Sequence, residues 1–448
     1  MTASRPDERL LARLRSRTAA GCAASGHRPA PDRGAASDRR PTADRPALTR
    51  HPSVPPPGTG RAPAGAPSPP PGSLPAVPIR HVDLAAVAAN TRLLSERAGG
   101  AVMAVVKADG FGHGAAAVAR TALAHGARSL GVTSIDEALA LRRAGLTAPV
   151  LSWLNAPGAD FAAALAADVQ TAVPSGRLLA AVAAAAGRTG RRAVVHLHAD
   201  VGMARDGAAP QQWARLCADA AAAERSGAVR VVGVMGHLGC ADRADDPCDR
   251  DAAARYRAAV DVARAAGLRP RVRHLAATAA VLDAPATHFD LARVGAGLVG
   301  IDPTGRRRLR PALTVTAPVV GVRTVPAGSR VGYGHDHRVT RPSRLALLPL
   351  GYADGLPRTA TGRAAVLLGG RRRPLVGLVS MDQVVVDVTD PPSAPGPAVR
   401  AGDRAVVLGP GRAGEPTAED WARWSDTIPH EIVTGFGPRV RRFTEEYR

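Results

Sequence analysis

The chain has 448 residues, enough for two or three domains, and 45% of them are hydrophobic, so a sizeable core can form. No long apolar run occurs that predicts a membrane-spanning helix, and no secretory signal is evident. The net charge is +21, but residues 1–76 hold 12 arginines against 5 acidic residues, and aromatic residues make up only 3%. A nucleic-acid partner is therefore not indicated. The four cysteines form no C-x-x-C pair, so no metal site or disulfide framework is predicted, and a reducing cytoplasm fits.

Residues 1–76 are rich in proline, alanine and arginine, and they include Pro55-Pro56-Pro57 and Pro69-Pro70-Pro71. This composition cannot bury enough apolar surface to offset the entropy of ordering the chain. The segment is predicted to be a disordered extension that precedes the folded domains.

Between residues 77 and 308, short β-rich runs alternate with apolar helical stretches. A helix is predicted at Leu84–Glu96, and helical segments such as Ala115–His125, Ile135–Gly145 and Gln211–Arg225 separate most of the strands that follow. Eight strands are predicted, at Ala101–Ala108, Ser129–Ser134, Ala148–Trp153, Val169–Pro174, Ala193–Ala199, Val229–Gly239, Arg271–Ala276 and Ala292–Gly297. Eight such repeats are typical of a closed (β/α)8 barrel, whose chemistry lies at the carboxyl ends of the strands.

Residues 309–448 follow a different pattern, which predicts a smaller and mostly β domain. Its predicted strands are Leu345–Gly351, Ala364–Leu368, Leu375–Val379, Val384–Val388 and Ala405–Leu408. Gly369 and Gly370 separate two of these runs, as in a hairpin. Thr417 followed by Asp420 resembles a capping box, which predicts a short helix through Trp421 and Trp424.

Lys107 is the only lysine in the chain, against 58 arginines. A guanidinium cannot become a neutral amine, whereas an ammonium can, so the remaining lysine is where amine chemistry is expected. Lys107 stands at the end of the first predicted barrel strand and precedes a glycine-rich stretch, a position that suits a Schiff base to an aldehyde cofactor. The alternative, that one lysine remains by chance, is not excluded by composition alone.

The segment Ala104-Val-Val-Lys-Ala-Asp-Gly-Phe-Gly-His-Gly114 is similar to the signature of bacterial alanine racemases. These are pyridoxal-phosphate (PLP) enzymes with a barrel and a C-terminal β domain. Further similar motifs follow in order: Asp200-Val-Gly-Met-Ala-Arg205, His237, His274–Ala280, Arg293-Val-Gly-Ala-Gly297, Val331-Gly-Tyr-Gly334, Leu350-Gly-Tyr-Ala-Asp-Gly355 and Ser380-Met-Asp-Gln383. One such motif is weak, but the ordered series from about Val77 to Arg448 is specific.

The resemblance implies a racemase with two bases on opposite faces of the substrate. Lys107 then carries PLP and is the base for the D-enantiomer, and Tyr333 is the base for the L-enantiomer. A phenol has an ordinary pKa of about 10, so cations must lower it, and His237 and Arg293 resemble the residues that do so. Arg293 also matches the residue that faces the pyridine nitrogen of PLP. Because arginine does not give up its proton, this nitrogen stays neutral.

The resemblance also implies the residues that bind the phosphate and the substrate. Thr278 and the backbone amides of Gly295 and Ala296 match the phosphate contacts. Arg205 and the backbone amide of Met381 match the contacts of the substrate carboxylate. Two further residues complete the set: Tyr352, which matches a residue of the substrate entrance, and Asp382, which is similar to a structural residue near Tyr333.

Five positions depart from the family pattern: Phe111 and Pro438 in place of phosphate-binding tyrosines, His198 in place of a carbamylated lysine, Ala277 in place of an asparagine and Val299 in place of a tyrosine. None removes a catalytic base. They predict weaker cofactor binding or an altered substrate preference, with slower turnover of alanine than in a housekeeping enzyme.

His196, His198 and Asp200 share one face of a strand by a period of two, which can imitate a metal site. Side-chain layers fill barrel interiors without a metal, so this interpretation is not favoured. His335 and His337 are expected to be surface or entrance residues.

The sequence therefore predicts a cytoplasmic homodimer that interconverts L- and D-alanine, with the residue matching Tyr333 delivered into the partner's barrel. The D-alanine would serve peptidoglycan or a secondary-metabolite pathway. Four alternatives stay open: racemisation of another small amino acid such as serine, a related PLP decarboxylase, a non-catalytic PLP carrier, and a divergent PLP-binding paralogue of low activity. The β domain counts against the carrier, and DNA binding is the weakest interpretation.

Overall fold

The computed structural model describes residues 76–99, 101–243, 246–306, 309–390 and 398–445. The extension that the sequence predicts to be disordered lies outside these residues, apart from Ala76. No helix among the described residues is both long and apolar enough to cross a membrane.

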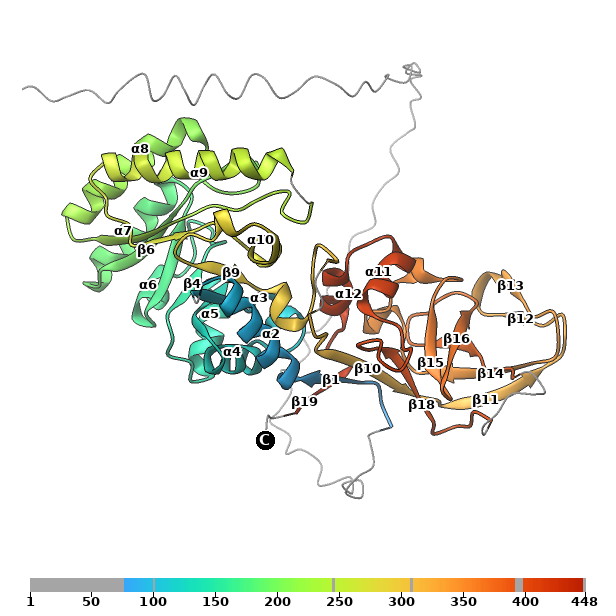
Figure 1. Cartoon of the computed structure of the whole chain (residues 1–448). Helices are drawn as coiled ribbons and strands as arrows, with labels where there is room; N and C mark the ends of the chain where they lie inside the picture. Colours follow the sequence, from blue (N-terminus) through green and yellow to red (C-terminus); the bar gives the residue numbers. More distant parts are fainter. Residues whose placement is uncertain (1–75, 100, 244–245, 307–308, 391–397, 446–448) are drawn as a thin grey trace, which may run out of the picture. The chain divides into compact units, whose positions relative to one another are not determined.

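The eight strands predicted between residues 77 and 308 form one parallel sheet (Figure 1). Its spatial order is β8-β7-β6-β5-β4-β3-β2-β9. A bridge between Ala277 and Arg293 joins the two outer strands, β8 and β9, so the sheet closes into a barrel. The strands are β2 (Val102–Val105), β3 (Ala127–Val132), β4 (Val150–Ser152), β5 (Val169–Val173), β6 (Ala193–His198), β7 (Val229–Met235), β8 (Val272–His274) and β9 (Ala292–Val294).

Helices follow most of the barrel strands, as the alternating pattern predicts. They are α2 (Leu84–Arg97), α3 (Lys107–Phe111), α4 (Ala115–Ala124), α5 (Ile135–Arg143), α6 (Phe161–Ala166), α7 (Gly176–Thr189), α8 (Pro210–Arg225), α9 (Pro247–Ala265) and α10 (Thr278–Asp283), with 3₁₀ turns η1 (Pro285–Thr287) and η2 (Ala296–Val299). Polar side chains fix several starts: Asp83 caps α2, Ser175 caps α7, and Ser134 with Glu137 forms a capping box on α5. Parallel strands that alternate with helices in this way form a (β/α)8 barrel, which confirms the predicted fold class.

A nine-stranded sheet forms the second part of the fold, with the order β11-β14-β17-β16-β15-β18-β10-β1-β19. Its strands are β1 (Ile79–Asp83), β10 (Leu313–Pro318), β11 (Gly321–Val325), β14 (Ser343–Leu348), β15 (Ala365–Leu368), β16 (Arg371–Val376), β17 (Val384–Asp387), β18 (Arg404–Leu408) and β19 (Arg441–Glu445). The strands β12 (Arg330–Val331) and β13 (His337–Arg338) pair with each other in a separate two-stranded sheet. Strand β1 comes from the segment expected to belong to the barrel, yet it pairs with β10 and β19.

Short helical elements complete the β domain: η3 (Tyr333–His335), η4 (Tyr352–Asp354), η5 (Arg358–Ala360), α11 (Ala418–Ser425) and α12 (Pro429–Gly435). The predicted hairpin is present, since Gly369 and Gly370 have φ of 60° and 73° and connect the paired strands β15 and β16. The predicted capping box is also present, with Thr417 and Asp420 at the start of α11. These positive φ angles favour glycine and explain the Gly-Gly pair.

Candidate active site

Lys107 lies two residues after β2, at the carboxyl edge of the barrel, and it opens an unusual turn. Ala108, Asp109, Gly110 and Phe111 all have positive φ, at 52°, 53°, 63° and 56°, so the segment labelled α3 contains a left-handed turn. Left-handed helical geometry costs about 1–2 kcal/mol for each residue with a Cβ atom. Strain of this kind persists only where surrounding contacts impose it, and it clusters at functional sites.

Two carboxylates hold this turn in place. The backbone N–H of Ala108 donates to Glu137 Oε1 at 2.8 Å. Asp109 accepts from the backbone of Ala115 and forms an ion pair with Arg442, which belongs to β19. Burial alone would raise the pKa of Glu137, but hydrogen bonds from Thr133, Ser134 and Ala108 outweigh it and lower the pKa. Glu137 is therefore ionised while it fixes the residue next to Lys107.

Arg293, on β9, is the most enclosed cation of the site, with an exposed fraction of 6%. Its guanidinium donates to the carbonyls of His274 and Gly236 at 2.8 and 2.6 Å. It also donates to His237 Nδ1 at 3.1 Å and lies 3.2 Å from His274 Nδ1. Burial lowers the pKa of Arg293 to about 10, so the group stays positively charged at neutral pH.

A row of neutral side chains continues from Arg293 through the barrel interior. His274 Nε2 lies 2.9 Å from His196 Nδ1, and His196 Nε2 lies 2.9 Å from Gln170 Oε1. The Gln170 oxygen can only accept, so one consistent proton arrangement results: His196 donates from Nε2, His274 donates from Nε2, and Arg293 donates to His274. Burial lowers the pKa of His196 to about 4 and that of His274 well below its ordinary value. This row orients Arg293 without adding charge.

Two other basic side chains of the barrel mouth, Lys107 and His237, have lowered pKa values, partly because positive charges lie close to them. Burial lowers the pKa of Lys107, the nearby charge of Arg205 lowers it further, and Glu137 opposes them. Burial lowers the pKa of His237 to about 3, with Arg293 and Arg205 adding to the shift. His237 is therefore a neutral imidazole, and because Nδ1 accepts from Arg293, its proton is on Nε2.

A small pocket opens beside His237, and its lining includes Arg205, His198 and Asp206. His198 Nδ1 lies 3.5 Å from Asp206 Oδ2. The nearby His198 ring lowers the pKa of Asp206 although burial opposes it, and Arg205 contributes in the same direction. The Arg205 guanidinium gives the pocket a group that suits recognition of a small anion such as a carboxylate.

The predicted phosphate cradle lies where β9 leads into η2. Thr278 Oγ1 accepts from the backbone N–H of Gly297 at 3.2 Å, so its hydroxyl hydrogen is free to donate elsewhere. A Cβ atom on Gly295 would meet the Phe111 ring at 2.8 Å, so Phe111 covers this glycine directly. The Phe111 ring in turn contacts His430 of α12, with ring centroids 6.3 Å apart. His430 Nδ1 is buried and has no hydrogen-bond partner among the described residues.

Four predicted site residues belong to the β domain and lie on its surface. Tyr333, Met381 and Tyr352 have exposed fractions of 72%, 52% and 42%. Their segments are neighbours: the backbone N–H of Tyr352 donates to the Ser380 carbonyl at 3.0 Å. Asp382 forms an ion pair with Arg439 at 2.8 Å, and Arg439 also pairs with Asp354 at 2.9 Å. The structure therefore brings Lys107, Arg205, His237 and Arg293 together, while the β-domain residues form a separate exposed group.

The structure bears on two points that the sequence raised, the candidate metal site of His196, His198 and Asp200 and the position of Pro438. His196, His198 and Asp200 do not converge, because His196 is bonded to His274 and Gln170, and Asp200 Oδ1 accepts from three backbone amides that follow it. Pro438 is exposed, and the residue of the C-terminal segment that reaches Phe111 is His430.

Sequence reasoning also missed several residues that support the site: Glu137, Gln170 and His430. The Ser134-x-x-Glu137 pattern is a capping-box signal and could have identified Glu137. Gln170 and His430 carry no local signal, since only the folded chain brings them to His196 and Phe111.

A half-buried lysine, a buried arginine and a neutral histidine at the mouth of a (β/α)8 barrel define an enzyme of amine chemistry that binds an anionic ligand. The chain matches the models of the alanine racemase N-terminal domain over residues 82–303 and the alanine racemase C-terminal domain over residues 312–444. It therefore belongs to the alanine racemase family.

Individual relatives agree with this assignment. The alanine racemase of Frankia casuarinae is 50% identical over 368 residues, which cover 81% of this chain and 94% of the relative. The crystal structure of alanine racemase from D-cycloserine-producing Streptomyces lavendulae has a TM-score of 0.80 at 42% identity, and the match covers 84% of this chain and 99% of that one. The alanine racemase of Bartonella henselae, solved with covalently bound pyridoxal phosphate, has a TM-score of 0.75 at 26% identity, covering 83% and 100%.

Proposed function

We propose that this protein is a PLP-dependent racemase that interconverts L- and D-alanine. The observation that carries the proposal is the position of the only lysine. Lys107 is half-buried at the barrel mouth, where burial and Arg205 lower the pKa of its amine. A lowered pKa increases the neutral fraction of the amine, which is the form that attacks an aldehyde and removes a proton.

The residues of the barrel mouth fit PLP. Lys107 supplies the amine for the aldehyde, and Arg293 supplies a buried donor for the ring nitrogen. Thr278 and the backbone at Gly295 and Ala296 supply small groups for the phosphate. The buried and unpartnered Nδ1 atom of His430, next to Phe111, supports the phosphate position because a bound oxygen would satisfy it.

PLP supplies an electron sink that makes the α-hydrogen of an amino acid acidic. Racemisation then requires that one group remove this proton and that another return it on the opposite face. We assign the D-side proton to Lys107 Nζ and the L-side proton to the Tyr333 hydroxyl. General acid–base catalysis of this kind contributes about 10²–10⁴-fold to a rate.

Arg293 favours racemisation over other reactions of the same cofactor. Its bonds to two backbone carbonyls fix the guanidinium, and the neutral row through His274 adds no carboxylate that could take its proton. Because a guanidinium donates and does not accept, Arg293 leaves a facing ring nitrogen unprotonated. Electron withdrawal is then limited, and quick return of the proton is favoured.

Substrate recognition is assigned to Arg205 and to the backbone amide of Met381, which receive the carboxylate. Asp206 and His198 line the same pocket as Arg205, and the charges of Asp206 and Arg205 are close enough to interact. Tyr352 is assigned to the entrance, and Asp382 has a structural role through its ion pair with Arg439.

We further propose that the enzyme is a homodimer with shared active sites. Tyr333 is 72% exposed in the single chain, whereas a base must act in a site from which water is excluded. A second copy that covers Tyr333, Tyr352 and Met381 would bring these residues to the partner's Lys107 site. The proposal includes a cytoplasmic location and supply of D-alanine to peptidoglycan or a secondary-metabolite pathway.

The test uses the purified, PLP-loaded full chain with L-alanine, L-serine and other small amino acids as separate substrates. We expect D-alanine to form, with a kcat/KM for alanine at least tenfold above that for serine. A preference for another amino acid would reject alanine as the substrate, and release of carbon dioxide without racemisation would indicate a decarboxylase.

A further inference from the structure

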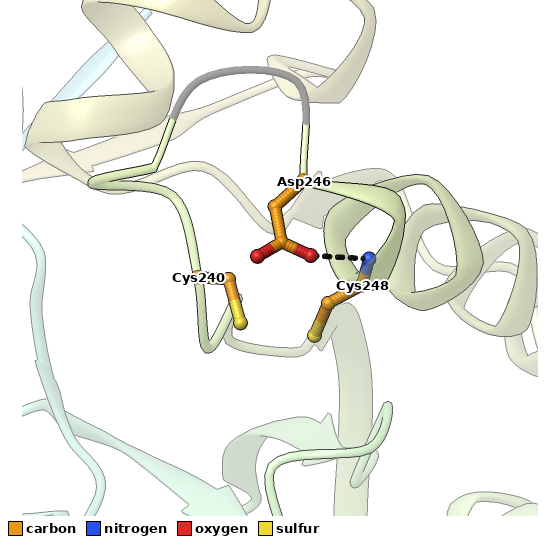
Figure 2. A group of neighbouring side chains, drawn as sticks. All are labelled: Cys240, Asp246 and Cys248. Atoms are coloured by element: carbon orange, nitrogen blue, oxygen red, sulfur yellow. Dashed lines mark hydrogen bonds between the residues drawn. The ribbon is translucent and has the colours of Figure 1, made fainter. Parts of the chain in front are cut away.

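The loop between β7 and α9 carries a cluster of side chains that the proposed reaction does not use. The loop begins with Gly236 and His237, and three of its later residues converge in space: Cys240, Asp246 and Cys248 (Figure 2). One ligand atom from each, the two Sγ atoms and a carboxylate oxygen, lie within 4.8 Å of one another. The sequence predicted no metal site because no C-x-x-C pair is present. The two cysteines are eight residues apart in the sequence, and the folded loop brings them together.

Hydrogen bonds at the start of α9 hold the two cysteines in place. Asp246 is the N-cap residue of α9, and its Oδ1 atom accepts from the backbone N–H of Cys248 at 2.9 Å. Asp249 Oδ1 accepts from the backbone N–H of Cys240 at 3.3 Å. The thiols of Cys240 and Cys248 lie close enough to form a hydrogen bond with one another. The cap uses Oδ1 of Asp246, whereas Oδ2 has only the distant Arg243 guanidinium at 4.0 Å and can therefore act as a ligand.

The charge around this cluster favours a cation, in contrast to the chain as a whole. The net charge of the protein is +21. Here, however, Asp246 and Asp249 interact electrostatically with the Cys248 thiol, and Asp242 and Asp246 interact with Asp249. Arg243 approaches only at 4.0 Å from Asp246. Carboxylates concentrated next to two thiols create a local negative potential that a divalent cation would neutralise.

We propose that Cys240, Cys248 and Asp246 bind a thiophilic divalent cation, with Zn²⁺ as the best fit and water as the fourth ligand. Tetrahedral zinc with Zn–S of about 2.3 Å and Zn–O of about 2.0 Å places its ligand atoms about 3.5–3.8 Å apart, so only small side-chain shifts are needed. Binding releases the two thiol protons to the solvent. A pair of thiolates binds soft cations in preference to hard cations such as Mg²⁺ or Ca²⁺.

A disulfide between Cys240 and Cys248 is the main alternative. It requires loss of two electrons to an oxidant, and it would use only the two thiols, leaving the Asp246 carboxylate with its capping role alone. The cation accounts for all three side chains.

The bound cation would connect the loop that begins at His237 to the first turn of α9. Because the His237 ring bonds to Arg293 at 3.1 Å, the order of this loop is linked to the order of the barrel mouth. The inference stands on the geometry of the loop and not on the proposed racemisation.

The experiment titrates the reduced, metal-free, PLP-loaded full chain with Cd²⁺, a thiophilic probe whose thiolate bonds absorb in the ultraviolet. We expect one cation per chain, displaceable by Zn²⁺. The Cys240→Ser/Cys248→Ser double variant should lose the absorption, whereas Cys217→Ala should retain it, because Cys217 is buried on α8 away from the loop. Asp246→Asn keeps a good N-cap residue but removes the charge, so it should weaken binding at least tenfold.

Three results would overturn the proposal. The first is that the wild-type protein binds no cation at micromolar concentrations, and the second is that the double variant binds as well as the wild type. The third is that the two thiols re-form a disulfide after removal of the reductant and take up no cation. Hydrogen exchange gives a second readout that does not depend on the variants. Residues 239–243 and 246–250 should exchange more slowly with Zn²⁺ bound, and unchanged exchange would contradict the proposed cross-link.

Discussion

The barrel mouth and the exposed group of the β domain place their polar residues in opposite environments. In the barrel, Arg293 and His237 are enclosed, and each side chain has partners that fix its orientation and its protonation state. In the β domain, Tyr333 and Met381 are more than half exposed. The barrel mouth is thus organised within a single chain, whereas the β-domain residues can act on a buried amine only after another surface covers them.

This difference separates two kinds of group in the site, those with a fixed charge and those that exchange protons. Groups that must keep one charge state, such as Arg293, are surrounded by partners that cannot exchange a proton with them. Tyr333, which we propose gives and takes a proton, comes from a region that the single chain leaves open to water. The predictions below test this division, from the largest expected effect to the smallest.

Replacing Tyr333 by phenylalanine should have the largest effect in the β domain. Tyr333→Phe removes the proposed L-side base, so we expect racemisation to fall about 10²–10⁴-fold. Exchange of the α-hydrogen of D-alanine with deuterated solvent should fall much less, because Lys107 remains.

The matched control is a tyrosine of the barrel. The Tyr256 hydroxyl is buried and donates to the Val234 carbonyl at 2.6 Å. Tyr256→Phe should reduce stability by about 1 kcal/mol and leave racemisation nearly unchanged. Equal losses of activity in the two variants would show that Tyr333 has no special role.

Acid should destabilise the protein through the buried histidines of the barrel. Burial lowers the pKa of His113 and His196 to about 4 from an unfolded value of about 6.5, and it also lowers that of His274 well below the unfolded value. The unfolded chain therefore binds protons first, so this stability is complete above pH 6.5 and is lost as the pH falls from 6.5 towards 4. Each histidine should contribute about 1.4 kcal/mol per pH unit in that window, measured by urea unfolding.

A single variant sharpens this test. His113→Gln should make the stability less dependent on pH by about one proton. An unchanged pH dependence in His113→Gln would contradict the account.

His430 provides a test of the cofactor site from the β-domain side. If His430 Nδ1 donates to the phosphate, His430→Ala should weaken PLP binding about tenfold, since a hydrogen bond to a charged group contributes about 1.5–3 kcal/mol. Fluorescence titration of the apoenzyme with PLP measures this. Pro438→Ala is the control, because Pro438 is exposed and should leave the affinity unchanged. Weakening by Pro438→Ala and not by His430→Ala would contradict the assignment of His430 to the phosphate.

The smallest effect is expected at Asp206, which we infer positions Arg205. Asp206→Asn removes the carboxylate charge that interacts with Arg205, and such an interaction near the surface contributes at most about 1 kcal/mol. The KM for alanine should therefore rise up to about fivefold, with kcat within a factor of two. Asp219→Asn, which affects an exposed pair with Arg215 on α8, should change neither constant. A fall in kcat without a change in KM would argue against a role in substrate binding.

Much of the barrel could be predicted because its strands and helices alternate over short distances. The eight strands were found, with ends that the structure shortens, as at β7, where the predicted Val229–Gly239 ends at Met235. The larger sheet was predicted only in part, because β1 and β19 are far apart in the sequence and pair only in the folded chain. Local patterns contain no signal for such pairing.

The candidate site divides in the same way. Lys107 and Arg293 could be identified because one is a unique residue type and the other lies in a glycine-rich motif. His430 and the cluster of Cys240, Asp246 and Cys248 could not, because neither the contact with Phe111 nor the convergence of the loop follows from residue spacing. Tertiary contacts determine both.

The most direct test of the central claim is the racemisation of alanine by Lys107→Arg. This variant keeps a positive charge at the barrel mouth and removes the only side-chain amine of the protein. The account predicts loss of the visible absorption of bound PLP and of D-alanine formation from L-alanine, in a chain that folds as the wild type does. Racemisation at the wild-type rate by Lys107→Arg would contradict it.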